Sequence, residues 1–238
     1  MSRKAKKFWY WWDKIGILCI LIVVAVVFGV IDTRIVQPNQ LITALSRTAV
    51  TGIAAAGMMF AIVAGGFDLS VGSILSLTSC VIAVQLTGGK STFMAILMAL
   101  LIAALCGAVN GLIITKLKIQ TFVATLATQL AFAGITLVYC SKAIQLTSKV
   151  NKELKFFSTG KFLGLIPMPI VLLIVVYILT YLVYKKTPFG TKTRAIGSNE
   201  AAARTTGIKV DVSLILIFVV TAVTAGMGGG FETHTSSA

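Results

Sequence analysis

Long apolar runs alternate with short polar turns along most of this 238-residue chain. A helix needs about 20 predominantly apolar residues to cross a bilayer, and most of the runs approach or exceed that length. The pattern therefore predicts an all-α polytopic membrane protein with about seven hydrophobic helical segments. The expected segments are residues 15–31, 48–63, 71–86, 93–115, 119–139, 166–184 and 213–228.

Small residues recur at helical spacing inside one of these segments. Ala103, Gly107 and Gly111 are four residues apart in turn, so they share one face of the predicted helix. Such rows allow helix backbones to approach closely in lipid. We interpret this row as a packing surface.

The composition agrees with a membrane protein. Only 12% of the residues are charged, whereas a typical soluble domain has about 25%. The formal net charge of +14 could indicate a nucleic-acid partner. Most of the basic residues lie beside apolar runs, however, which is the positive-inside pattern of membrane proteins. We therefore expect contact with membrane lipid and no nucleic-acid partner.

The first 14 residues combine basic and aromatic side chains. Because basic residues favour the cytoplasm and Trp and Tyr favour the membrane interface, residues 1–14 are expected to form a cytoplasmic N-terminus. A secretory signal is the rival interpretation, but it needs a shorter apolar core and a small-residue cleavage site. No clear site follows Val30. Residues 15–238 are expected to form a single transmembrane domain.

A polar motif interrupts the apolar sequence at residues 65–73, which read Gly-Gly-Phe-Asp-Leu-Ser-Val-Gly-Ser. Non-helical backbone survives at membrane depth only inside protein or beside water, so a broken or re-entrant helix is expected here. Asp68 can cap the following helix by accepting from N–H groups near Ser70. The alternative is that an acid at this depth marks a transport pathway. Asn110 is likewise expected either to hydrogen-bond a neighbouring helix or to line that pathway.

The loop at residues 185–212 is the only long stretch that is dense in both glycine turns and charge. Its second half predicts a short helix that Asn199 caps and Gly207 ends. Glu200 and Arg204 are four residues apart with the acid first, which is the favourable order for a pair on a helix. The sequence therefore predicts a polar helix outside the membrane segments.

Alanines form the middle of this short helix, as Ala201, Ala202 and Ala203. Alanine favours helix, but three alanines bury little surface, and a helix this short is marginal on its own. Because its side chains are small, this alanine face would fit a groove on another protein. The alternative is a solvated cytoplasmic turn that happens to be helical.

Three stretches of the chain resemble permease subunits of bacterial ATP-binding cassette (ABC) importers for sugars of the ribose, xylose and galactose type. The family carries a Gly-Gly-x-Asp-Leu-Ser-Val-Gly signature, an Asn-Gly pair followed by Gln-x-Phe, and an Asn-Glu-Ala-Ala-Arg core before Gly-Ile. The resemblance extends over nearly the whole chain from residue 15. The matching residues include Gly65, Gly66, Asp68, Leu69, Ser70, Val71, Gly72, Asn110, Gly111, Gln120, Phe122, Thr187, Pro188, Phe189, Gly190, Arg194, Asn199, Glu200, Ala201, Ala202, Arg204, Gly207 and Ile208.

This resemblance implies a permease in the cell membrane that translocates a monosaccharide-class substrate. In the family, the loop docks on a separate ABC ATPase subunit, and an extracytoplasmic sugar-binding protein docks on the outer face. A second permease chain completes the importer, here as a homodimer. The residues that the resemblance assigns to ATPase coupling are Asn199, Glu200, Ala201, Ala202, Arg204 and Gly207.

The sequence shows no catalytic, cofactor-binding or metal-binding pattern. The four cysteines are widely scattered and the chain has a single histidine, so metal-ligand spacing and a base–nucleophile set are both missing. Gly89-Lys90-Ser91 mimics the end of a phosphate-binding loop, but that pattern needs a glycine where Val84 stands. We therefore expect no enzyme activity in this chain.

Two other functions stay open. An ion-coupled secondary transporter or channel would also use a broken helix with an acid, although it has no need of the helix at 199–208. The other is an inactive, truncated permease. Permeases of the resembling family continue for several helices beyond the polar tail at residues 232–238, so we expect a C-terminally shortened chain.

The basic residues predict the orientation of the loops. With a cytoplasmic N-terminus, thirteen Lys and Arg fall inside, as five before the first helix, two at 116–118 and six at 185–209, and eight fall outside. In intact cells, Lys152→Cys should therefore react with a membrane-impermeant thiol reagent, and Thr205→Cys should not. The chain with its native cysteines alone is the background control. Reaction at Thr205→Cys would contradict the orientation.

Overall fold

The computed structural model describes residues 3–34, 37–140, 160–162, 164 and 166–235. It divides into two compact units, Met1–Leu45 and Ser46–Ala238. Helices dominate both units, so the prediction of an all-α polytopic membrane protein is confirmed. Most of the predicted outer loop at residues 140–165, including Lys152, lies outside the described residues.

The first unit contains helix α1 (Arg3–Ile31) and the start of α2 (Pro38–Val63). Helix α1 begins twelve residues before the predicted membrane segment, because no glycine or proline interrupts the basic and aromatic stretch that precedes it. The Asp32 carboxylate accepts from the backbone N–H of Arg34 at 2.9 Å just after the helix ends. Helix α2 begins ten residues earlier than predicted, with Pro38 in its first turn, where a missing N–H costs nothing.

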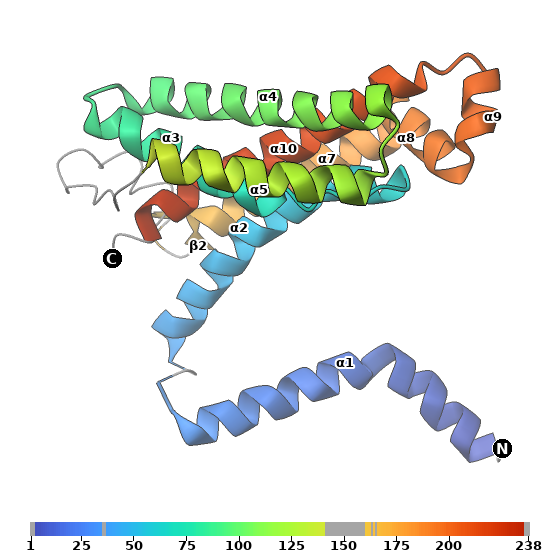
Figure 1. Ribbon diagram of the computed structural model, residues 1–238. Helices are drawn as coiled ribbons and strands as arrows, with labels where there is room; N and C mark the ends of the chain where they lie inside the picture. The colour runs from blue at the N-terminus through green and yellow to red at the C-terminus, as the bar shows by residue number, and fades with distance from the viewer. Residues whose placement is uncertain (1–2, 35–36, 141–159, 163, 165, 236–238) are drawn as a thin grey trace. The chain divides into compact units, whose positions relative to one another are not determined.

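The second unit is a bundle of helices. Helix α10 (Val210–Thr235) packs most extensively against α4 (Thr92–Leu117) and then against α3 (Val71–Thr87) (Figure 1). Each remaining predicted apolar segment lies mostly or wholly within one of its helices. Among the described helices, α2, α4, α5, α7 and α10 are long and apolar enough to cross a membrane, whereas α3 and the apolar part of α1 are shorter. The helices of this unit that follow α2 are α3 (Val71–Thr87), α4 (Thr92–Leu117), α5 (Thr121–Tyr139), α7 (Met168–Lys186), α8 (Pro188–Ser198), α9 (Glu200–Thr205) and α10 (Val210–Thr235).

A two-stranded antiparallel hairpin precedes α7 and was not expected from the sequence. Strands β1 (Lys161–Phe162) and β2 (Ile166–Pro167) pair with Lys161 opposite Pro167. Gly164 lies between them with φ +75°, a left-handed conformation that glycine adopts without strain. The apolar run read as beginning at residue 166 therefore starts as a strand and becomes helical at Met168.

Glycines on α4 allow α10 to lie against it at backbone contact distance. A Cβ atom on Gly107 would lie 2.5 Å from the carbonyl oxygen of Phe218, and one on Gly111 would lie 2.6 Å from the Cα of Ile215. Ala103, the third member of the predicted row, is fully buried. The interpretation of this row as a helix-packing surface is confirmed.

Gly107→Ala should therefore destabilise the bundle. The added methyl would meet backbone atoms of α10 that cannot move aside as a side chain can, and overpacking of this kind costs about 1–3 kcal/mol. Gly134→Ala on α5 is the matched control, because nothing lies within 4 Å of its Cβ position. Thermal unfolding in detergent should show a lower midpoint for Gly107→Ala and an equal or higher one for Gly134→Ala. Equal midpoints for Gly107→Ala and the wild type would contradict the close approach.

Candidate functional site

The backbone between α2 and α3 is irregular over residues 64–70, and side chains of α5 satisfy it. The Thr121 hydroxyl accepts from the N–H of Phe67 at 3.3 Å. The Thr125 hydroxyl accepts from the N–H of Leu69 at 3.1 Å and lies 3.2 Å from the carbonyl oxygen of Phe67. These contacts pair the N–H groups of Phe67 and Leu69, and the N–H groups of residues 64–66 bond to carbonyls of α2. Irregular backbone inside a bundle requires such partners.

The structure brings the three predicted polar residues of this region into one hydrogen-bonded chain. The amide of Asn110 on α4 donates to the Ser70 hydroxyl at 2.7 Å, and that hydroxyl donates to Asp68 Oδ1 at 2.6 Å. Asp68 is 1% exposed, and Ser70 and Asn110 are 0% exposed. Within the described residues, Asp68 Oδ2 and Asn110 Oδ1 accept no hydrogen bond. These hydrogen bonds connect the helix break to α4.

Asp68 lies at the entrance to α3 without being its N-cap. Its Oδ1 also accepts from the backbone N–H of Ser70 at 2.9 Å, and Ser70 is the N-cap residue, with no capping bond from its own side chain. The Ser70 carbonyl accepts from the Ser73 hydroxyl at 2.8 Å. Asp68 therefore fixes the residue that begins the helix. Whether its charge also serves a pathway stays a prediction.

Sequence reasoning missed Thr121 and Thr125 as partners of the break. The available signal was their spacing, since residues four apart at the start of a helix present two hydroxyls on one face. Helix α5 begins with Thr121, so this face lies level with the broken segment. The two threonines hold backbone in place and are structural partners of the Asp68 chain.

The predicted short helix is present as α9, and its expected local contacts are observed. The Asn199 side chain accepts from the N–H of Ala202 at 3.0 Å and so caps the helix. Glu200 and Arg204 form an ion pair at 2.8 Å. Gly207 follows with φ +83°. Of the helix's own residues only Ala203 is buried, which leaves the other two alanines exposed.

Helix α8, in the first half of the same loop, was not predicted. Pro188 opens it, and its two glycines, which favour a turn in sequence, permit close contact with other segments. Gly190 lies against the carbonyl of Tyr184, and Gly197 lies against the carbonyl of Val63. The Arg194 guanidinium donates to the Tyr184 carbonyl at 2.6 Å and lies 4.8 Å from the centre of its ring. Helix α8 is thus anchored to the ends of α7 and α2.

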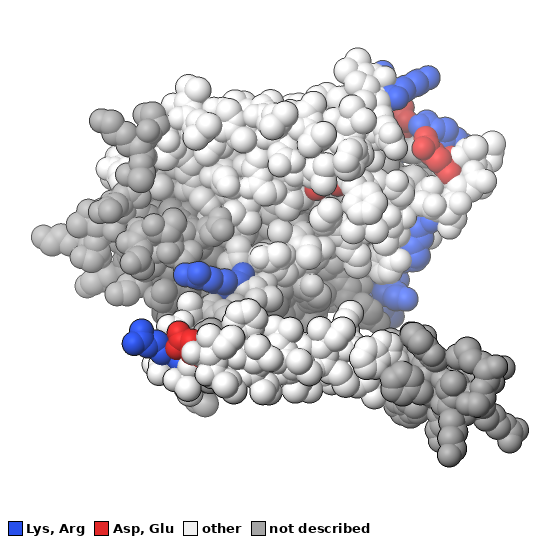
Figure 2. All heavy atoms as spheres, turned by 60° about the horizontal axis from the view of Figure 1, so that its bottom comes forward, with Lys and Arg blue, Asp and Glu red and all other residues white. Residues whose placement is uncertain are grey.

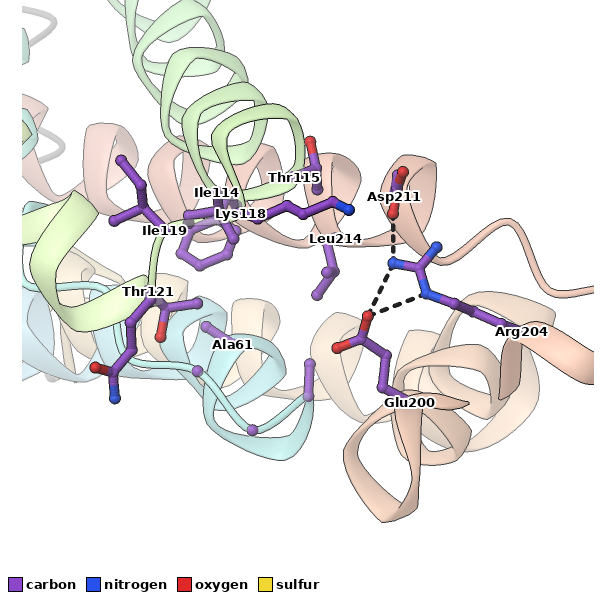
Figure 3. Close-up of a pocket in the computed structure, with 15 residues that line it drawn as sticks. Ala61, Ile114, Thr115, Lys118, Ile119, Thr121, Glu200, Arg204, Asp211 and Leu214 are labelled. Carbon is purple, nitrogen blue, oxygen red and sulfur yellow. Dashed lines mark hydrogen bonds and ion pairs between the residues drawn. The ribbon is translucent and has the colours of Figure 1, made fainter. Parts of the chain in front are cut away.

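A single guanidinium joins α9 to the first turn of α10. Nη2 of Arg204 donates to Oε1 of Glu200 at 2.8 Å and to Oδ1 of Asp211 at 2.6 Å (Figure 3). The hydrogen bond to Asp211, and then the bond to Glu200, raises the pKa of Arg204, so this cation stays charged at any physiological pH. Sequence reasoning missed Asp211, although an acid in the first turn of a helix is a usual signal of a dipole or capping contact.

A cavity of about 850 Å³ opens between α9 and the ends of the bundle helices. Charged side chains of α9 and α10 face the turn between α4 and α5 across it (Figure 3). Its volume lies within the usual range of ligand pockets, although it is partly open. It is lined by Ala61, Ala64, Gly65, Gly66, Ile114, Thr115, Lys118, Ile119, Gln120, Thr121, Glu200, Arg204, Asp211, Leu214 and Phe218.

Charge is concentrated at this end of the second unit. Over the helices of that unit, the face drawn in Figure 2 is almost free of charged side chains, and most of those visible gather where α8 and α9 lie. A charge-free belt suits a lipid environment, and a charged end suits water or a protein partner.

Residues 40–237 match the protein family described as the permease component of the branched-chain amino acid transport system. The chain belongs to this permease family. Its members are transport subunits of ABC importers, multi-pass proteins of the cell membrane, and not enzymes. The permease described here is 36% identical to the ribose import permease protein of Bacillus subtilis over 93% of this chain and 68% of that relative.

Other curated relatives also import sugars by name. The permease is 34% identical to the ribose import permease protein of Haemophilus influenzae, over 88% of this chain and 65% of the relative. It is 30% identical to the D-allose transport system permease protein of Escherichia coli, over 98% and 71%. The chain thus spans about two thirds of these relatives' length. No solved structure matches it.

The geometry at Asp68 predicts different results for two substitutions. Asp68→Asn keeps an acceptor oxygen at the Oδ1 position, so both bonds from Ser70 can persist and most transport should remain. Asp68→Ala leaves the buried Ser70 hydroxyl and N–H without this partner and should destabilise the permease by about 1–3 kcal/mol. Uptake at matched membrane abundance and thermal unfolding in detergent test both. Loss of uptake by Asp68→Asn at normal abundance would show that the charge itself serves transport.

Proposed function

We propose that this permease is the membrane-spanning subunit of an ABC importer that translocates a monosaccharide-class substrate. The names of the relatives support the substrate class, because ribose and D-allose are both monosaccharides. The matched length supports it too, since each of these matches extends over more than four fifths of this chain. ATP is hydrolysed by a separate subunit, and this chain binds no nucleotide.

The importer assembles from several chains. An ABC ATPase binds the loop at 185–212, an extracytoplasmic sugar-binding protein delivers the substrate to the opposite face, and two copies of the permease form the pathway. Lipid surrounds the helices whose face in Figure 2 is almost free of charge. The N-terminus and the loop at 185–212 lie in the cytoplasm, as the distribution of basic residues indicates.

The exposed alanine face of α9 is the observation that supports ATPase docking most directly. Ala201 and Ala202 are exposed, whereas Ala203 packs inward among Ile196 and Val210. Methyl groups let the backbone of a partner approach closely, and the Asn199 cap holds a short helix in its bound form beforehand. Such preorganisation lowers the entropy cost of binding.

Docking on α9 allows a movement of the ATPase to displace part of the permease. A movement of the ATPase displaces α9, and the bundle helices respond by changing which side of the membrane the substrate can reach. Helix α8 remains anchored to α7 and α2 by Arg194 and its glycine contacts. The displacement is therefore concentrated in α9 and in the segment that follows it.

Ion-coupled transport is a second candidate function, and one observation favours it. Asp68 is buried, no described side chain forms an ion pair with it, and its Oδ2 accepts no hydrogen bond within the described residues. Intramembrane acids of this kind mark ion pathways in secondary carriers. Such a carrier has no use for a capped, exposed α9, so ATPase docking remains the better-supported function.

Bulk on the alanine face should block docking. Ala202→Trp places a large ring where the partner has to approach closely, so co-purification with the cognate ATPase should fall by at least about tenfold, as expected for overpacking of 1.4 kcal/mol or more. Arg204→Gln should impair coupling less severely, because it adds no bulk. Glu200→Lys should also be harmful, since it puts a cation at the positive end of α9 and like charges four residues apart.

Ile135→Trp, on an exposed part of α5, is the control for the effect of an added tryptophan on membrane abundance. It should leave the ATPase complex intact. The measurements are co-purification and ATPase activity in membranes. A wild-type yield of complex with Ala202→Trp would mean that α9 faces solvent in the assembled importer and would overturn the docking role.

A further inference from the structure

Helix α9 has few attachments to the rest of the second unit. It has six residues, and Ala203 is the one that is buried. That methyl packs in a small cluster with Ile196 of α8 and Val210 of α10. A single alanine contact is a weak mechanical link, because it buries little surface.

The cavity of about 850 Å³ separates α9 from three of the helices that it could otherwise move. Glu200 and Arg204 lie on one side, and Thr115 and Lys118, from the end of α4 and its turn to α5, lie on the other (Figure 3). An open space of this size cannot carry a push from α9 directly to the ends of α4 or α5. Helix α8 adjoins α9 through Asn199 and is anchored to α7 and α2. The route from α9 to α4 runs through α10.

The turn at residues 206–209 connects α9 to α10, and its backbone is bonded mainly to α9. The N–H of Gly207 donates to the Arg204 carbonyl and the N–H of Ile208 to the Ala203 carbonyl, both at 3.2 Å. Gly207 has φ +83°, which suits this helix stop. A side-chain bond across the turn adds a direct link from α9 to α10.

Arg204 and Asp211 supply such a link. The guanidinium on the last turn of α9 donates to the carboxylate on the first turn of α10 at 2.6 Å, spanning the turn between the helices. Glu200 accepts from the same nitrogen at 2.8 Å and holds the guanidinium on its own helix. The Arg204 guanidinium thus bonds both Glu200, at the start of α9, and Asp211 on α10.

Helix α10 is in turn held tightly against α4. At Gly107 and Gly111 the two helix backbones are in direct contact, with no side chain between them. Asn110 lies between these two glycines on α4 and bonds Ser70 at the helix break. A displacement that reaches α10 is therefore passed to α4 and to the buried Asp68 chain.

We propose that Asp211 is a positioning residue that transmits the displacement of α9 to α10 through Arg204. This role rests on the proposed function, because it assumes that an ATPase moves α9. Asp211 acts through Arg204, to which it is bonded at 2.6 Å. Its carboxylate keeps the first turn of α10 fixed to α9 while load is applied.

Asp211→Asn tests the link, because it removes the charge and keeps the shape. With the cognate ATPase and binding protein in proteoliposomes, we expect the complex to form as before. Transport per ATP hydrolysed should fall by about fivefold, the lower end of the range for couplings between sites. Asp211→Glu should restore the ratio, and Lys116→Gln, an exposed charge change outside the loop at 185–212, should leave it at the wild-type value.

Arg204→Gln breaks the same link from the other side and keeps the test usable if Asp211→Asn fails to accumulate. The double variant should be no worse than Arg204→Gln alone, because both remove one interaction. A wild-type transport-to-ATP ratio for Asp211→Asn or Arg204→Gln would overturn the proposal. If instead the wild-type chain bound no ATPase, the proposed function would fail. The Arg204–Asp211 link would then be tested only by measuring the mobility of α9.

Mobility of α9 can be measured on the permease by itself. A spin label on Thr205→Cys reports it in lipid nanodiscs, with the exposed Cys19 and partly exposed Cys140 replaced by serine. The label should become more mobile with Asp211→Asn and should stay restrained with Lys116→Gln. Equal mobility with and without the Asp211 carboxylate would overturn the proposal whether or not an ATPase binds.

Discussion

Close contact between α10 and its neighbours is the constraint on which the bundle depends. Lipid tails are as apolar as leucine, so helices in a membrane gain little from hiding apolar side chains against each other and rely on close packing and interhelical hydrogen bonds. Gly107 and Gly111 provide the packing. Hydroxyls add the bonds, from Thr221 to the Gly57 carbonyl at 3.2 Å and from Ser79 to the Gly229 carbonyl at 2.8 Å.

The two polar regions of the permease take their places from this packing. Helix α4 presents Asn110 to the helix break because Gly107 and Gly111, on the same helix, face α10. Helix α10 presents Asp211 to Arg204 because its first turn emerges where α9 ends. The buried chain at Asp68 and the exposed link at Asp211 are therefore connected by two helices whose backbones are in direct contact.

The features that depend on neighbours in sequence could be predicted. Long apolar runs gave the helices, and the Asn199 cap with the Glu200–Arg204 pair gave α9, because each contact lies within four residues. Helix α8 could not be predicted in this way. Gly190 and Gly197 favour a turn locally, and only the carbonyls of Tyr184 and Val63, from other segments, show why glycine is needed in a helix there.

The same limit applies to the candidate site. The sequence singled out Asp68, Ser70 and Asn110, but the bond from Asn110 to Ser70 joins residues forty positions apart, and the sequence did not predict this pairing. Thr125 and Asp211 were missed for the same reason, since their partners lie on other elements of the fold. Residue type identified candidates, and helix packing decided which of them meet.

Amide hydrogen exchange over residues 187–209 tests the docking role of α9 most directly. In the permease alone, a six-residue helix with one buried side chain should exchange fast, because short exposed helices open readily. Addition of the cognate ATPase in nanodiscs should slow exchange at residues 201–206 and leave the anchored α8 less affected. Unchanged exchange at residues 201–206 in a complex shown to be intact would contradict the account.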